Sequence, residues 1–125
     1  MLFRSPEDLV PQLEGAMTFC ELAGIPSLTL EGVEADDTIG ALVNFSTPLG
    51  INNYICTSDK DLAQLVSDST FLVHAHKENR QVDKDAVVEI FGVKPEQIVD
   101  YLALVGDTSD NIPGVAGIEI GRAHV

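Results

Sequence analysis

Residues 31–40 read Glu-Gly-Val-Glu-Ala-Asp-Asp-Thr-Ile-Gly and place three carboxylates, Glu34, Asp36 and Asp37, within four positions. The stretch follows a short apolar run and precedes a helical pattern of apolar residues. Like charges this close repel one another, so the cluster costs stability unless a cation lies between the carboxylates. We therefore expect this stretch to bind a divalent metal ion, and the rest of the fold to position it.

Two further acidic groups repeat this arrangement downstream, namely Asp59 with Asp61 and Asp107 with Asp110. A spacing of two residues puts both side chains on one side of an extended segment. A spacing of three residues puts them on one face of a helical turn, as it does for Glu34 and Asp37. Hard oxygen ligands without histidine or cysteine favour magnesium or manganese over zinc.

Each group taken alone also has an ordinary structural explanation. Asp36 and Asp37 fall in the first turn of an expected helix, where acidic residues are favoured. Asp59 can cap the next helix, and Asp107 and Asp110 can serve a turn and a cap. Because a helix end needs one acidic residue and not two or three, the three groups together favour a metal site with many carboxylates, although its reaction class stays open.

Other polar residues have two interpretations. Lys60 either contacts a substrate phosphate or compensates the charges of Asp59 and Asp61. His74 and His76 alternate on an expected strand without an evident third metal ligand, so we expect exposed residues at a strand end. The glycines of residues 112–118 permit close approach of another backbone or leave amides for a phosphate, and an ordinary turn explains them equally well.

The composition indicates one globular domain of 125 residues with 45% apolar residues. The net charge of −13 argues against nucleic acid as a partner unless metal ions offset the acidic site. No apolar run is long enough to span a bilayer and no secretory signal is evident. Cys20 and Cys56 match no zinc spacing. We expect a cytoplasmic protein with reduced thiols and without membrane association.

Helical and extended patterns alternate along the chain. Helices are expected from Ser5 to about Ala23 and over 35–46, 59–66, 83–91 and 95–105, and strands over 25–30, 53–57 and 70–73. This order predicts an α/β fold with a mostly parallel sheet covered by helices. Functional groups in such sheets collect at the carboxyl ends of strands, which is where the first two acidic groups would lie.

Three motifs together resemble the 5′–3′ exonuclease domain of bacterial DNA polymerase I and its flap-endonuclease relatives in the PIN-like superfamily. They are Gly-Val-Glu-Ala-Asp-Asp at 32–37, Thr-Ser-Asp-Lys-Asp at 57–61 followed by Ala-Gln-Leu-Val at 63–66, and Asp-Tyr-Leu-Ala-Leu-Val-Gly-Asp-Thr-Ser-Asp-Asn-Ile-Pro-Gly-Val at 100–115. Their order and spacing agree with the family from about Pro6 to Ile118.

The resemblance implies a nuclease that removes 5′ ends, flaps and RNA primers from DNA with two magnesium or manganese ions. The implied reaction is in-line attack by an activated water on a phosphodiester. It assigns metal ligation to Glu34, Asp36, Asp37, Asp59, Asp61, Asp107 and Asp110, with a catalytic role for Asp36, Asp37, Asp59 and Asp107.

The resemblance also implies the start of a helix–three-turn–helix element over 106–118. That element grips duplex DNA through backbone amides and a bound potassium ion, and Gly114, Val115, Gly117 and Ile118 match its glycine turn. With Lys60 these residues form the expected DNA contacts. Ala116 stands where the family usually has proline.

The family pattern has a first strand with a metal-binding aspartate and a basic helical arch, and the chain begins after both. We therefore expect an internal piece of a longer protein, with a partial α/β domain over 1–105 that folds poorly and has little activity alone. Residues 119–125 depart from the family and resemble the translation of a sequencing-adapter read-through, so we expect an artefact.

Two other functions stay open. One is a catalytically inactive nuclease-like scaffold that binds DNA, and the other is a related nuclease that cleaves RNA. We expect no oligomer.

Overall fold

The computed structural model describes residues 9–118, which divide into two compact units at Ala35 and Asp36. The start of the first helix, expected at Ser5, and the heptapeptide 119–125 lie outside the described residues. No helix in the described part of the chain is long and apolar enough to cross a membrane.

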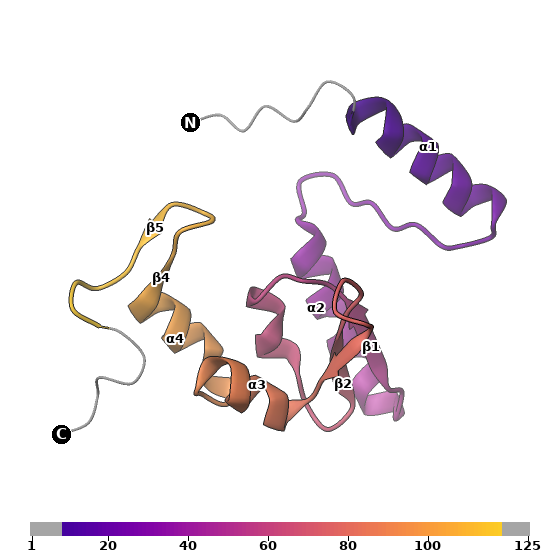
Figure 1. The fold of residues 1–125 in the computed structure, drawn as a ribbon. Coiled ribbons are helices and arrows are strands. Elements are labelled where there is room, and N and C mark those ends of the chain that lie inside the picture. The colour runs from indigo at the N-terminus through magenta and orange to yellow at the C-terminus, as the bar shows by residue number, and fades with distance from the viewer. Residues whose placement is uncertain (1–8, 119–125) are drawn as a thin grey trace. The chain divides into compact units, whose positions relative to one another are not determined.

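The first unit contains helix α1 (Leu9–Leu22) and an irregular segment that leads to Ala35 (Figure 1). Gly24 ends the helical run in the left-handed conformation, and the Ile25 amide donates to the Cys20 carbonyl at 2.8 Å. Glycine commonly ends helices in this way, and the helix ends close to the predicted limit at about Ala23. The apolar side chains of α1 are exposed; Leu13 and Met17 are 55% and 54% accessible.

The prediction of a strand over 25–30 is wrong, because these residues form no strand. Leu28 and Leu30 are 66% and 58% exposed, so the apolar run buries neither face. A strand needs backbone partners on a neighbouring strand, and none of the strands in residues 9–118 pairs with this segment.

The second unit is an α/β unit around a three-stranded sheet in the order β1-β2-β3. Strands β1 (Asn53–Cys56) and β2 (Thr70–His74) are parallel, with Asn53 opposite Thr70. Strand β3 (Arg80–Val82) pairs with β2 in the antiparallel direction, with Leu72 opposite Val82. The sheet is therefore mixed, and β3 is a strand that the sequence pattern does not predict.

Helical elements surround this sheet and lead to a small hairpin, β4 with β5, beyond α4 (Figure 1). Their bounds are α2 Ala35–Ser46, η1 Thr47–Leu49, η2 Asp61–Leu65, α3 Lys84–Phe91, η3 Pro95–Gln97, α4 Ile98–Val105, β4 Gly106–Asp107 and β5 Ile112–Pro113. The helix expected over 59–66 is a 3₁₀ helix, and the one expected over 95–105 begins with a 3₁₀ turn. Asp83 caps α3 by accepting a hydrogen bond from the Ala86 amide at 2.9 Å.

One apolar cluster joins η2, the sheet, α3 and α4. Its fully buried members include Leu72, Val87 and Ile98. In α2 the core side is formed by Val43, which is buried, and by Ile39, whereas Leu42 and Phe45 are 47% and 72% exposed. The apolar pattern of residues 35–46 also predicts burial of Leu42 and Phe45, and that prediction is wrong. Ile39 and Val43 are four residues apart and so form one face of the helix, which is the face that packs on the core.

Candidate metal centre

The loop after β1 is shaped by two local hydrogen bonds. The Asp59 amide donates to Thr57 Oγ1 at 2.9 Å, and the Asp61 amide donates to Asp59 Oδ1 at 3.0 Å. A side-chain oxygen that accepts a hydrogen bond from the backbone amide two residues later folds the chain into a tight turn. The capping interpretation of Asp59 is wrong, because the N-cap of η2 is Lys60 and no side chain caps that helix. Asp59 instead forms a turn just before the helix, and this turn places Asp61 in the first turn of η2.

The β4–β5 hairpin positions the other acidic pair. Asp107 lies opposite Ile112, and its Oδ1 accepts a hydrogen bond from the Ser109 amide at 2.8 Å. Asn111 has a φ of +58°, the left-handed conformation that asparagine tolerates better than most residues and that a tight turn requires. The hairpin holds Asp107 at 7% exposure while Asp110 stays exposed.

Carboxylates from η2 and from the hairpin converge. One oxygen from each of Asp61, Asp107 and Asp110 lies within 4.8 Å of the others, and we call these three residues the acidic triad. Among the described residues, Asp61 Oδ1 is buried without a hydrogen-bond partner. A buried carboxylate oxygen that lacks a partner is costly, and three hard oxygen donors at this separation fit a magnesium or manganese ion. The triad therefore has the donors for a divalent cation.

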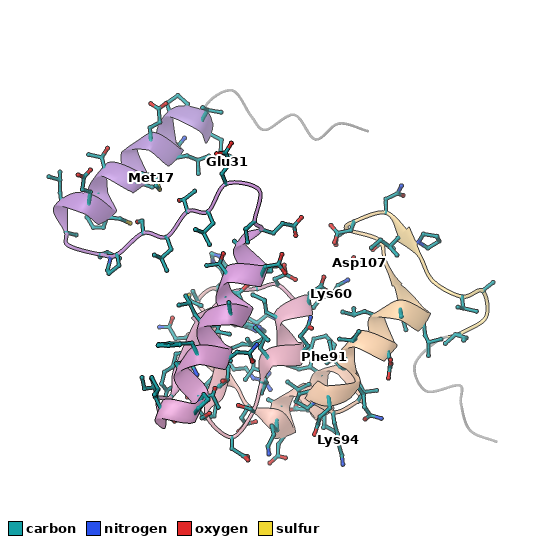
Figure 2. All side chains as sticks on the ribbon, turned by 180° about the vertical axis from the view of Figure 1, so that it is seen from behind. Met17, Glu31, Lys60, Phe91, Lys94 and Asp107 are labelled. Carbon is teal, nitrogen blue, oxygen red and sulfur yellow. The ribbon has the colours of Figure 1, made fainter. Side chains whose placement is uncertain are left out.

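Lys60 also lies at this site. Its Nζ contacts Asp107 Oδ1 at 2.7 Å, and Figure 2 shows the two residues near one another, Lys60 just before η2 and Asp107 in the hairpin. The sequence predicts that Lys60 compensates Asp59 and Asp61 if it does not contact substrate, but its ion pair is with Asp107. Forty-seven residues separate the partners, so no local pattern could identify the pair.

The charges around the triad act on its members in opposite directions. Burial raises the pKa of Asp61, and the charges of Asp59 and Asp107 raise it further. The hydrogen bond from Lys60 lowers the pKa of Asp107, helped by the Ser109 amide. The same hydrogen bond raises the pKa of Lys60. An added cation would therefore favour the charged form of Asp61, against its burial and the neighbouring charges.

The ion pair predicts how the thermal stability of Lys60→Met, compared with that of the parent, depends on pH in the absence of divalent ions. The pKa of Asp107 is lowered, so its stabilisation is complete above 3.8 and is lost as pH falls through its folded pKa. The pKa of Lys60 is raised, so its stabilisation is complete below 10.5 and is lost above its folded pKa. We expect Lys60→Met to unfold at a lower temperature than the parent at pH 7, and the difference to shrink as the pH falls below 3.8 and through the folded pKa of Asp107. A thermal midpoint that is unchanged at pH 7 would show that the pair contributes nothing to stability.

A hollow of about 370 Å³ lies beside the triad, lined by Thr57, Ser58, Asp59, Lys60, Asp107, Ser109 and Asp110, and we call it the acidic hollow. A neighbouring hollow of about 400 Å³ is lined by residues of α2 and η2, among them Asp36, Asp37 and Asp61. Asp61 therefore belongs both to the triad and to the hollow that the first turn of α2 borders. The structure thus brings carboxylates of all three sequence groups to adjoining hollows.

Two of the predicted ligands are placed differently. Asp59 borders the acidic hollow, but its Oδ1 is used by the Asp61 amide and it is outside the triad. Glu34 belongs to the first unit, so its role as a ligand stays a prediction.

The glycine turn after the hairpin has a structural role. A Cβ on Gly114 would collide with the carbonyl group of Val105, and one on Gly106 would collide with the Gly114 amide. The backbones approach closely here, which is one of the two interpretations given above. The Val115 amide donates to the Leu104 carbonyl at 2.8 Å and the Ile118 amide to the Val115 carbonyl at 3.1 Å, so these two amides are occupied within the chain.

Comparison with known proteins gives the family. Residues 4–92 match the 5′–3′ exonuclease N-terminal resolvase-like domain, and residues 93–124 match the 5′–3′ exonuclease C-terminal SAM fold. The chain is 48% identical over 113 residues to DNA polymerase I of Pseudomonas aeruginosa, covering 90% of this chain and 12% of that protein. It is 41% identical over 115 residues to a 5′–3′ exonuclease of Aquifex aeolicus, covering 92% of this chain and 39% of that protein.

Solved structures of a bacteriophage T5 enzyme are similar to this fold. A T5 flap endonuclease in a pseudo-enzyme–product complex with DNA and metal ions aligns with a TM-score of 0.81 and 27% identity, over 96% of this chain and 46% of that one. The T5 5′-exonuclease with bound zinc aligns with a TM-score of 0.79 and 28% identity, over 93% and 45%. The chain thus spans less than half the length of these relatives, and it belongs to the 5′–3′ exonuclease family, whose members include the exonuclease domain of DNA polymerase I.

Proposed function

We propose that this chain is part of a magnesium-dependent, structure-specific 5′–3′ exonuclease or flap endonuclease that acts on DNA in replication and repair. Its substrates are 5′ ends, 5′ flaps and RNA primers on DNA, and its parent protein is a DNA polymerase I. The observation that carries the proposal is the acidic triad, in which one oxygen from each of Asp61, Asp107 and Asp110 lies within 4.8 Å of the others. Within residues 9–118, Asp61 Oδ1 is also buried without a hydrogen-bond partner. Family membership supports the substrate class.

Asp61, Asp107 and Asp110 are the residues that would hold a divalent ion, and Asp36 and Asp37 border the next hollow, where a second ion would find ligands. Magnesium or manganese bound there would supply Lewis-acid stabilisation of phosphoryl oxygens and activation of water. The role of the chain is to hold the carboxylates in place. Asp59 does so through its hydrogen bond to the Asp61 amide, and Ser109 does so through its amide at Asp107.

Lys60 is the cation nearest to this chemistry, since it pairs with Asp107 at the rim of the acidic hollow. Its ammonium group can turn from the carboxylate to a phosphate oxygen of the substrate, because its side chain is 37% exposed and flexible. Gly114, Val115, Gly117 and Ile118, with a potassium ion, are proposed to contact the duplex away from the cleaved bond. Val115 and Ile118 would do so through groups other than their amides, which donate within the chain.

Asp61→Asn separates stability from metal binding. Because the pKa of Asp61 is raised, its charge destabilises the fold above its folded pKa and has no effect below its ordinary value of 3.8. In a chelator at pH 7 the variant should therefore unfold at a higher temperature than the parent, with no difference near pH 2. Magnesium should stabilise the parent, by about 1.4 kcal/mol at ten times the dissociation constant, and stabilise the variant much less.

Asp100→Asn is the matched control, since Asp100 is exposed on α4 and lies outside the triad. It should respond to magnesium as the parent does. Equal stabilisation of the parent and Asp61→Asn by magnesium would contradict the assignment of Asp61 as a ligand.

Cleavage of a 5′-flap duplex by the complete gene product, with magnesium and with chelator, tests the function itself. We expect release of the 5′ strand with magnesium only. Tight binding of the flap substrate without cleavage in the presence of any divalent ion would contradict the proposed nuclease activity. It would favour the alternative of a catalytically inactive scaffold that binds DNA.

A further inference from the structure

A second hollow opens at the carboxyl edge of the sheet, and we call it the basic hollow. It has a volume of about 370 Å³ and is lined by Cys56, Thr57, Ser58, His74, Ala75, His76 and Lys77. Strand β1 ends at Cys56 and its parallel neighbour β2 ends at His74, so both strands deliver their last residues to this hollow. In α/β sheets, ligands bind outside the carboxyl ends of parallel strands.

The lining of the basic hollow is unusual for this chain. The chain carries a net charge of −13 and has three histidines, two of which line this hollow, together with a lysine and no carboxylate. Within residues 9–118, Lys77 forms no ion pair, whereas Lys60, Arg80 and Lys84 pair with Asp107, Glu89 and Asp68. The hollow therefore offers an ammonium group, two imidazoles and two hydroxyls as hydrogen-bond donors.

These donors favour an anion over a metal ion. Within residues 9–118, only the acidic triad brings three ligand atoms of His, Cys, Asp or Glu side chains close together. The side chains of Cys56, His74 and His76 therefore do not form a metal-binding group. Ammonium, imidazole and hydroxyl donors together match the oxygens of a phosphate group. The turn that carries Lys77 is fixed by hydrogen bonds from the Lys77 amide to the His74 carbonyl and from the Arg80 amide to the Lys77 carbonyl.

The basic hollow adjoins the acidic hollow. Thr57 and Ser58 line both of them, so two residues of the loop after β1 form the wall between the two sites. A nucleic-acid strand carries a phosphate at every nucleotide, so a strand with one phosphodiester at the acidic triad has another phosphate close by. The basic hollow supplies the ammonium group of Lys77 next to the acidic hollow, across the wall formed by Thr57 and Ser58.

We propose that the basic hollow is a phosphate-binding subsite that positions the substrate strand beside the phosphodiester to be cleaved. The inference rests on the proposed function, because it assumes that a strand occupies the acidic hollow. The ligand that this subsite recognises is a phosphate group, which can belong either to a nucleic-acid strand or to free inorganic phosphate. Lys77 and the two histidines are positioning residues in this account.

The test is an NMR titration of the isotope-labelled chain in chelator at low salt, first with inorganic phosphate and then with a short oligothymidylate. We expect saturable shifts at residues 56–58 and 74–77 with both probes. Lys77→Gln should weaken the affinity for inorganic phosphate and for the oligothymidylate by about tenfold each, since it removes a charge-assisted hydrogen bond. Lys94→Gln removes the same charge from an exposed position outside the hollow and should leave both affinities unchanged.

The outcomes separate this inference from the proposed function. Shifts that do not saturate, or that are equally strong in Lys77→Gln, would overturn the subsite. Binding of inorganic phosphate without the oligothymidylate would overturn the role in positioning a strand. Asp107→Asn should lose its response to magnesium and keep the response of residues 74–77 to phosphate, so a failure of the metal centre is visible independently of a failure of the basic hollow.

Discussion

Asp107→Ala is expected to lower magnesium-dependent cleavage of 5′-flap DNA by the complete gene product by at least about 100-fold. Asp107 is the one member of the acidic triad that is both buried and fixed from two sides, by Lys60 at 2.7 Å and by the Ser109 amide at 2.8 Å. Alanine removes a ligand oxygen and leaves Asp61 and Asp110 as the remaining members. The measurement is single-turnover cleavage of a labelled flap substrate over a range of magnesium concentrations.

Asp107→Asn distinguishes lost ligation from lost structure. The amide oxygen of asparagine can still accept from the Ser109 amide and from Lys60, but it carries no charge for a divalent ion. We expect a similar loss of cleavage in Asp107→Asn while its folded structure is kept, and unchanged cleavage in Asp100→Asn. Full cleavage by either Asp107 variant would contradict the assignment of Asp107 as a ligand.

Gly114→Ala is expected to destabilise the folded chain by about 3 kcal/mol, because its methyl group would overlap the Val105 carbonyl group. Backbone cannot rotate away as a side chain can, so the hairpin would have to separate from the end of α4. That separation would also strain the hydrogen bond from the Val115 amide to Leu104 and displace Asp107 from the triad. Denaturant unfolding measures the loss of stability.

Gly40→Ala is the matched control for that prediction. Gly40 lies inside α2, and a Cβ there meets nothing within 4 Å. Alanine in a helix interior is favoured over glycine by about 0.5–1 kcal/mol, so this variant should be as stable as the parent or more stable. Equal stability of Gly114→Ala and Gly40→Ala would contradict the close approach of the two backbones.

Local patterns predicted the elements whose stability is set locally. The α2 helix, its acidic first turn and the helix expected over 83–91 follow from short-range rules and agree with the structure. The segment 25–30 shows the limit of such rules. Its apolar run is compatible with a strand, but a strand exists only where another strand supplies backbone partners, and sequence patterns do not reveal which partner is present.

The site was predicted in its residue types and less well in its contacts. Spacing selects three acidic groups with seven carboxylates, and the structure brings one oxygen from each of Asp61, Asp107 and Asp110 together. The ion pair between Lys60 and Asp107 was missed because it depends on the packing of η2 against α4 and the hairpin that follows. The basic hollow was missed for a similar reason, since His74 and Lys77 meet Ser58 only when β1 and β2 pair in parallel.

The most direct test of the central claim is paramagnetic broadening of the NMR signals of the chain by substoichiometric manganese. If Asp61, Asp107 and Asp110 bind a divalent ion, the amide signals of residues 59–62 and 106–111 broaden first, chelator restores them, and Asp107→Asn abolishes the effect. Broadening centred on other acidic residues, such as Asp83, Asp85 and Glu89 of the α3 region, with sharp signals at the triad, would contradict the claim.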